Sequence, residues 1–80
     1  MAVLRLFASA REAAGIGRDR IGGATVADVL SAAGDRYGSG FQQVLASCRI
    51  WVNGEAASVD MALRDDDEVA VLPPVSGGAL

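Results

Sequence analysis

One long amphipathic helix, predicted between Thr25 and Gly38, sets the strongest limit on how this chain folds. Five apolar residues fall on one stripe of this helix at helical spacing: Val26, Val29, Leu30, Ala33 and Tyr37. Thr25 can cap its first turn, with Asp28 three residues on to complete a capping box, and Gly38 stands where a left-handed residue ends a helix. A helix with one apolar stripe must bury it against another layer, which the rest of the chain has to supply.

A first strand is predicted over residues 3–8. Alternation divides its side chains into two faces, Leu4, Leu6 and Ala8 on one and Val3, Arg5 and Phe7 on the other. The charge of Arg5 marks the second face as exposed to solvent, so Phe7 is expected on the surface.

A short helical turn and a weaker strand are predicted next. Ser9 and Glu12 have capping-box spacing, and Gly15 and Gly17 can stop the helix that they would begin. The weaker strand covers residues 17–21. Residues 41–45 are expected to add another short helical turn after the long helix.

The second half of the chain predicts a hairpin and a last strand. Residues 48–52 form a strand in which Cys48 shares the buried face with Ile50 and Val52, while Trp51 lies on the opposite face with Arg49. Asn53-Gly54 is the strongest short signal for a hairpin turn. Residues 69–72 form the final strand, and Pro73-Pro74 ends it because proline has no amide hydrogen to donate to a sheet.

This order of elements predicts an α+β fold. A long helix between two pairs of strands favours a mixed sheet of four to five strands with the main helix packed on one face, and the β-grasp arrangement of ubiquitin is one such solution. No internal repeat or linker is present, so residues 1–80 are expected to form a single domain, with residues 73–80 as a flexible C-terminal tail.

Composition argues against several classes of function. A chain of 80 residues has no room for a deep pocket walled by its own side chains. It has no His and a single Cys, so Ser-His or Cys-His catalysis and a zinc site are improbable, and no catalytic or metal-binding residue is assigned. Cys48 is expected to be a buried small hydrophobe in a reducing compartment.

The net charge argues against binding of nucleic acids, and the lengths of the apolar runs argue against a membrane span. The net charge is −3, and the seven basic residues are all Arg, scattered along the sequence. No apolar run approaches the roughly 20 residues of a membrane span, and the N-terminus does not look like a signal peptide. We therefore expect a cytoplasmic protein. The acidic run of residues 65–68 is expected to be a solvated turn.

The C-terminal segment carries the strongest functional signal. It runs Pro73-Pro74-Val75-Ser76-Gly77-Gly78-Ala79-Leu80. The two prolines stiffen the exit from the sheet, and glycines without side chains can thread a narrow channel in another protein. The six residues that follow Leu72, from Pro73 to Gly78, can extend about 20 Å.

The sequence resembles the MoaD/ThiS family of β-grasp sulfur carriers over nearly its whole length. The resemblance rests on residues 3–12, 24–30 and 52–54, and above all on residues 63–78, where an Asp-Glu-Val strand continues into Pro-Pro-Val-Ser-Gly-Gly. Within that family the chain is most similar to the small subunit of molybdopterin synthase.

This resemblance implies a carrier that is not itself an enzyme. A ubiquitin-activating-type adenylyltransferase and sulfurtransferase would use ATP to adenylate Gly78, and sulfur would then displace AMP to leave a thiocarboxylate. The tail that carries the thiocarboxylate would enter the large subunit of molybdopterin synthase and donate sulfur to a pterin precursor. Gly77 would let the chain pass, and Phe7 with Pro73, Pro74, Val75 and Ser76 would contact the partner. No cofactor would be bound by the carrier itself.

Two residues depart from the family pattern, because Ala79 and Leu80 follow Gly78. The resemblance therefore implies that a protease removes them. Two other readings stay open. One is a sulfur carrier for another pathway, such as thiamine, cysteine or a secondary metabolite, and the other is a β-grasp interaction domain that carries nothing. A plant-type ferredoxin is excluded because its cluster needs four cysteines.

Overall fold

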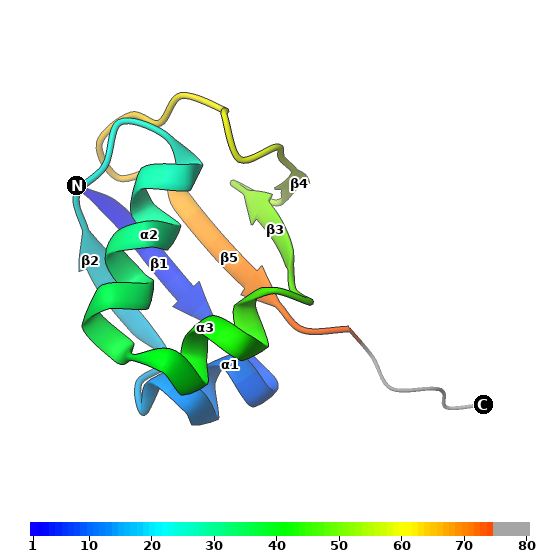
Figure 1. Cartoon of the computed structure of the whole chain (residues 1–80). Helices are drawn as coiled ribbons and strands as arrows, with labels where there is room; N and C mark the ends of the chain where they lie inside the picture. The colour runs from blue at the N-terminus through cyan, green and yellow to red at the C-terminus, as the bar shows by residue number, and fades with distance from the viewer. Residues whose placement is uncertain (75–80) are drawn as a thin grey trace.

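The computed structural model describes residues 1–74, which form one five-stranded sheet and three helices (Figure 1). In chain order the elements are β1 (Ala2–Leu6), α1 (Ala8–Ala14), β2 (Arg18–Ile21), α2 (Val26–Tyr37), α3 (Ser39–Leu45), β3 (Arg49–Val52), β4 (Glu55–Ala56) and β5 (Glu68–Leu72). The predicted α+β class is confirmed. No helix among these residues combines the length and the apolar character needed to cross a membrane.

The first and last strands lie side by side at the centre of the sheet. The strand order is β2-β1-β5-β3-β4, with β1 and β5 parallel and the other pairs antiparallel. Leu4 pairs with Val69 and Leu6 with Val71. A mixed sheet with the main helix between two hairpins is the expected β-grasp arrangement.

The core lies between α2 and one face of the sheet, as Figure 1 shows for α2 in front of β1 and β2. Leu4 and Val69 are completely buried, and so are Val26 and Val29 of the predicted helical stripe. Tyr37, at the end of that stripe, packs edge-on against Phe41 of α3, with ring centroids 5.1 Å apart. Phe41 is the largest fully buried side chain, so α3 closes one end of the core.

The predicted boundaries of α2 are correct at both ends. The hydroxyl of Thr25 accepts a hydrogen bond from the amide of Asp28 at 3.2 Å. Gly38 has φ +94°, a region that favours glycine, but its ψ of −175° is not that of a left-handed helix. This extended conformation lets α3 begin at the next residue, Ser39.

The predicted start of the short helix is wrong. The sequence predicts that the strand includes Ala8 and that Ser9 caps the helix. In the structure β1 ends at Leu6, and Ala8 has φ +50°, outside the range of a strand. The helix α1 therefore begins at Ala8, with Phe7 at the cap position and no side-chain cap. Ser9 lies inside the first turn, where its hydroxyl cannot cap.

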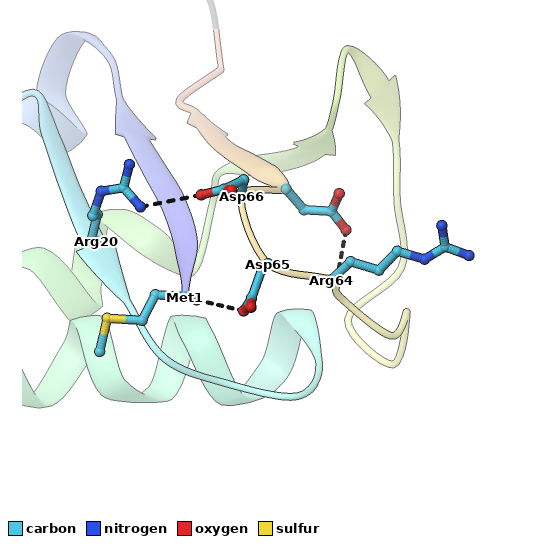
Figure 2. A network of polar contacts seen from close by, with 6 residues as sticks. Met1, Arg20, Arg64, Asp65 and Asp66 are labelled. Atoms are coloured by element: carbon cyan, nitrogen blue, oxygen red, sulfur yellow. Dashed lines mark hydrogen bonds and ion pairs between the residues drawn. The ribbon is translucent and has the colours of Figure 1, made fainter.

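The hairpin turn is confirmed, and the acidic run is a turn only in part: Asp65 and Asp66 form the turn, whereas Glu68 begins β5 and pairs with Val3. Asn53 and Gly54 have φ +50° and +85° and join β3 to β4. At the acidic run, the amino group of Met1 donates to Asp65 and Arg20 donates to Asp66 (Figure 2). These ion pairs are exposed and contribute little to stability. The hydrogen bond from the amino group of Met1, and then its charge, lower the pKa of the Asp65 carboxyl.

Candidate functional site

Two predicted contact regions come together at one end of the sheet. Because β1 and β5 are parallel, Phe7, which follows Leu6, and Leu72, which follows Val71, lie at the same end. Pro73, which is half-buried, and the exposed Pro74 continue from there (Figure 1). We call this end the exit end. Four of the residues assigned to the site, Val75, Ser76, Gly77 and Gly78, lie outside the described residues.

An open groove lies beside the prolines. It is lined by Arg49, Trp51, Leu72, Pro73 and Pro74 and has a volume of about 490 Å³. Trp51 is 37% exposed, as its predicted place on the outer face with Arg49 requires. Arg49 is opposite Leu72 across the β3–β5 pair, so the groove continues the helix-free face of the sheet. This groove offers an exposed aromatic ring beside the segment that leaves the sheet.

Phe7 lines a second hollow on the other side of the exit end. Its side chain is half-buried rather than fully on the surface, and the guanidinium carbon of Arg5 lies 5.3 Å from its ring centroid. Arg11 and Arg18 line the same hollow, which has a volume of about 550 Å³. Arg11 can lie across Gly17 because that residue has no Cβ.

The solvent-exposed face predicted for the first strand is only partly correct. Val3 was grouped with Arg5 on that face but is buried, with 6% exposure. Its neighbours across the sheet are Arg20 and Glu68. Their long side chains can cover a central valine even on the face without helices, which alternation within one strand does not reveal.

The described residues offer no set of groups for catalysis. Cys48 is partly buried and its thiol donates to the carbonyl of Val44 at 3.2 Å, while burial raises its pKa, so the reactive thiolate is disfavoured. Burial and the hydrogen bond to Asp19 raise the pKa of Tyr37 to about 12. Among residues 1–74, no three His, Cys, Asp or Glu side chains are placed to hold a metal ion. The arrangement suits docking and presentation of the segment beyond Pro74.

The sequence interpretation missed the side chains that surround this end. Trp51 and Arg49 had been placed on the outer face, but only the pairing of β3 with β5 puts them beside Leu72. Arg11 and Arg18 carried no local signal, because their nearness to Phe7 depends on how α1 and β2 return along β1.

The fold and the exit end together define a ubiquitin-like β-grasp protein. The structure superposes on small archaeal modifier protein 1 from Methanosarcina acetivorans with a TM-score of 0.87, at 33% identity over 96% of this chain and 95% of that one. It also matches a putative molybdopterin converting factor subunit 1 from Pyrococcus furiosus with a TM-score of 0.82, at 32% identity over 92% of this chain and 97% of the other.

Residues 4–78 match the model of the ThiS family, and the chain belongs to that family of ubiquitin-like sulfur carriers. It is 37% identical over 59 residues to a molybdopterin synthase sulfur carrier subunit from Phaeosphaeria nodorum. That similarity covers 64% of this chain and 62% of the relative. The resemblance expected from the C-terminal motif is thus confirmed at the level of the family.

Proposed function

We propose that this protein is the small subunit of a molybdopterin synthase and carries sulfur as a thiocarboxylate on Gly78. The observation that carries the proposal is the extent of the family match, which ends at Gly78 and leaves out Ala79 and Leu80. The fungal relative named as a sulfur carrier subunit of molybdopterin synthase supports the choice of pathway.

The chemistry begins with activation of a poor electrophile. A carboxylate oxygen of Gly78 attacks the α-phosphorus of ATP in the activating enzyme, and pyrophosphate leaves. Sulfur at the oxidation level of sulfide then attacks the acyl carbon and AMP leaves, which gives the thiocarboxylate. Its nucleophilic sulfur attacks a carbon of the pterin precursor in the large subunit, from which an oxygen substituent leaves. Water then cleaves the acyl–sulfur bond, which returns the Gly78 carboxylate and leaves the sulfur on the product. The large subunit supplies the catalytic residues. The carrier binds no cofactor, and ATP belongs to the activating enzyme.

The side chains at the exit end serve the partner rather than the chemistry. Phe7 and the segment Pro73, Pro74, Val75 and Ser76 contact the large subunit, and Gly77 lets the backbone pass through a narrow channel. The exposed Trp51 adjoins this region, and aromatic side chains often anchor interfaces. All of these steps take place in the cytoplasm.

Removal of Ala79 and Leu80 by a protease is part of the proposal. A carboxylate on Leu80 stands two residues beyond the acyl group that the family uses, and its branched side chain does not suit a channel made for glycine. The trimmed chain ends at Gly78.

The test compares three chains with the host's activating enzyme, ATP and a sulfur donor. The chain ending at Gly78 should form an acyl-adenylate and then gain the mass of one oxygen replaced by sulfur. The chain ending at Leu80 should remain unmodified, and Gly78→Ala in the shortened chain should impair transfer. If the untrimmed chain reacts as fast as the shortened one, trimming is wrong. If none of the host's activating enzymes adenylates the shortened chain, the proposed carrier function is wrong.

A second candidate function is attachment to other proteins. The similarity to small archaeal modifier protein 1 favours it, since that protein is named as a modifier. The chain would then join substrate amines through Gly78. Because the protein contains no Lys, one copy offers no side-chain amine to which a second copy could be attached. Covalent conjugates found with the tagged protein in its host would support this candidate, and a free thiocarboxylate with no conjugates would contradict it.

A further inference from the structure

The backbone of β2 presents hydrogen-bonding groups along a free edge of the sheet. β2 is the outermost strand on one side, where it pairs with β1 alone among the described strands (Figure 1). Directly before β2, the carbonyl of Gly17 accepts a hydrogen bond from the amide of Leu6 at 2.9 Å. The backbone groups of successive residues in a strand point alternately to its two sides. The N–H and C=O groups of Arg18 and Arg20 therefore point away from β1, toward the free edge.

Both outward groups of Arg20 already have partners within the chain. The amide of Arg20 donates to Oδ1 of Asp19 at 2.8 Å, and its carbonyl accepts from the guanidinium of Arg36 at 3.2 Å. The same nitrogen of Arg36 donates to Oδ2 of Asp19 at 2.8 Å. The hydroxyl of Tyr37 donates to that oxygen at 2.6 Å. One carboxylate, held by the last turn of α2, thus keeps occupied the positions at which a further strand would bond.

The charges on β2 also disfavour pairing between two copies of the chain. In an antiparallel pair of two β2 strands, outward-pointing residues lie opposite each other, so Arg18 would face Arg18 or Arg20 of the other copy. Like charges in this position are destabilising. Arg20 is paired with Asp66 at 3.2 Å, but Arg18 makes no ion pair within residues 1–74.

We propose that Asp19 and Arg36 form a cap that prevents the β2 edge from pairing with β2 of a second copy. We call these two side chains the edge cap. An unpaired edge is a template for a further strand, and β2 has four residues whereas the other edge strand, β4, has two. A second copy brings the same outward N–H and C=O groups, so two β2 edges can exchange hydrogen bonds around a two-fold axis. Without the edge cap the sheets of two copies join, and with it the chain stays monomeric.

The test is self-association of the full chain, measured by sedimentation equilibrium. Asp19→Ala removes the acceptor for both the Arg20 amide and Arg36, so it should lower the dissociation constant of the dimer at least about tenfold relative to wild type. The effect should be larger at about 0.5 M salt than at about 0.02 M salt, because salt screens the repulsion between opposed arginines. A wild type that dimerises as tightly as Asp19→Ala would overturn the proposal.

Arg36→Ala is a second variant of the edge cap. It frees the carbonyl of Arg20 but leaves the Arg20 amide bonded to Asp19, so it should promote dimerisation in the same direction and to a smaller extent. Arg36 is exposed, and if Asp19→Ala does not fold, Arg36→Ala carries the test alone. An Arg36→Ala chain that stays as monomeric as wild type would then overturn the proposal.

Two control variants separate loss of the edge cap from loss of charge or stability. Asp35→Ala removes the same charge from an exposed residue of α2 that makes no ion pair within the described residues. Tyr37→Phe removes one hydrogen bond to Asp19 but leaves the bonds of Asp19 to Arg20 and Arg36 in place. Both should stay monomeric under conditions in which Asp19→Ala dimerises, and equal dimerisation of either control would overturn the proposal.

Amide hydrogen exchange locates the contact in the dimer. In Asp19→Ala the amides of Arg18 and Arg20 should be protected at high concentration and exchange rapidly after dilution, since pairing of the two edges gives them acceptors. Protection of Glu55 and Ala56 in their place would put the contact at β4, and a dimer that protects neither edge would put it elsewhere. Either result would overturn the proposal. The measurements involve no partner enzyme, so they can fail while the carrier function holds, and the reverse is also true.

Discussion

Phe7 and Phe41 are the two phenylalanines of the chain, and they lie in different environments. Phe41 is completely buried in α3, which packs against α1 and α2, and its ring makes an edge-to-face contact with that of Tyr37. Phe7 is half-buried at the start of α1 and faces a hollow lined by arginines. Phe41 therefore belongs to the core, whereas Phe7 is available to a partner.

We expect Phe7→Ala and Phe41→Ala to separate binding from stability. Phe41→Ala should cost about 3–5 kcal/mol of unfolding free energy because it leaves a cavity in the core. Phe7→Ala should have a much smaller effect on unfolding but weaken association with the large subunit by about 1 kcal/mol or more. Urea denaturation and calorimetric titration measure the two effects. A large loss of stability with unchanged binding for Phe7→Ala would place that residue in the core.

Asp19 links β2 to α2 through its carboxylate. It accepts hydrogen bonds from the hydroxyl of Tyr37 at 2.6 Å and from Arg36 at 2.8 Å. The hydrogen bond from Tyr37 and then that from Arg36 lower its pKa. A carboxyl whose pKa is lower in the folded state stabilises that state above its unfolded pKa, and this contribution is lost as pH falls through the folded pKa.

The loss of folding stability at acid pH should therefore depend on Asp19. Between pH 7 and about pH 4 the wild type should be more stable than Asp19→Asn, and the difference should shrink as pH falls below about 4. Melting temperatures measured from pH 2 to pH 7 for both proteins test this. A difference that stays constant with pH would mean that the carboxylate charge contributes nothing.

At the scale of the element, the two predicted helix caps have different outcomes. Thr25 caps α2 as its sequence position indicates, because Asp28 presents its amide to the hydroxyl. Ser9 has the same spacing to an acidic residue, but α1 starts one residue before it. A capping motif is thus informative only when the chain enters the helix at that residue.

Thr25→Ala and Ser9→Ala test this difference with the same loss of a hydroxyl group. Thr25→Ala should lower the unfolding free energy by about 1 kcal/mol, since an amide of the first turn loses its partner. Ser9→Ala should change it by less than about 0.5 kcal/mol. Urea denaturation of both variants gives the comparison, and an equal loss in the two would contradict the observed start of α1.

At the scale of the whole molecule, the first and last strands of the described chain lie side by side in the centre of the sheet. β1 and β5 are the first and last strands, and their parallel pairing brings residues more than 60 positions apart into contact. The domain is therefore complete only when β5 has been added. This placement also fixes the position of Pro73 and Pro74 at the exit end.

A chain ending at Pro74 should keep the fold and lose the function. Its melting curve should match that of the full chain, because the last strand ends at Leu72. It should not be adenylated, since Gly78 is absent. Val71→Ala is the opposite control, which should lower the melting temperature by opening a cavity beside β1. A large loss of stability on removal of residues 75–80 would show that they contribute to the domain.

The sequence by itself determined the elements whose signals are local. The apolar stripe and cap of α2, the Asn53-Gly54 turn and the prolines after Leu72 act through backbone geometry within a few residues. The family motif at Gly77-Gly78 is likewise read along the chain. Tertiary structure alone decided the neighbours of each strand, the burial of Val3 and the gathering of Arg18 and Arg49 around the exit end. These depend on pairings between distant strands, and no property of one segment specifies which segment packs beside it.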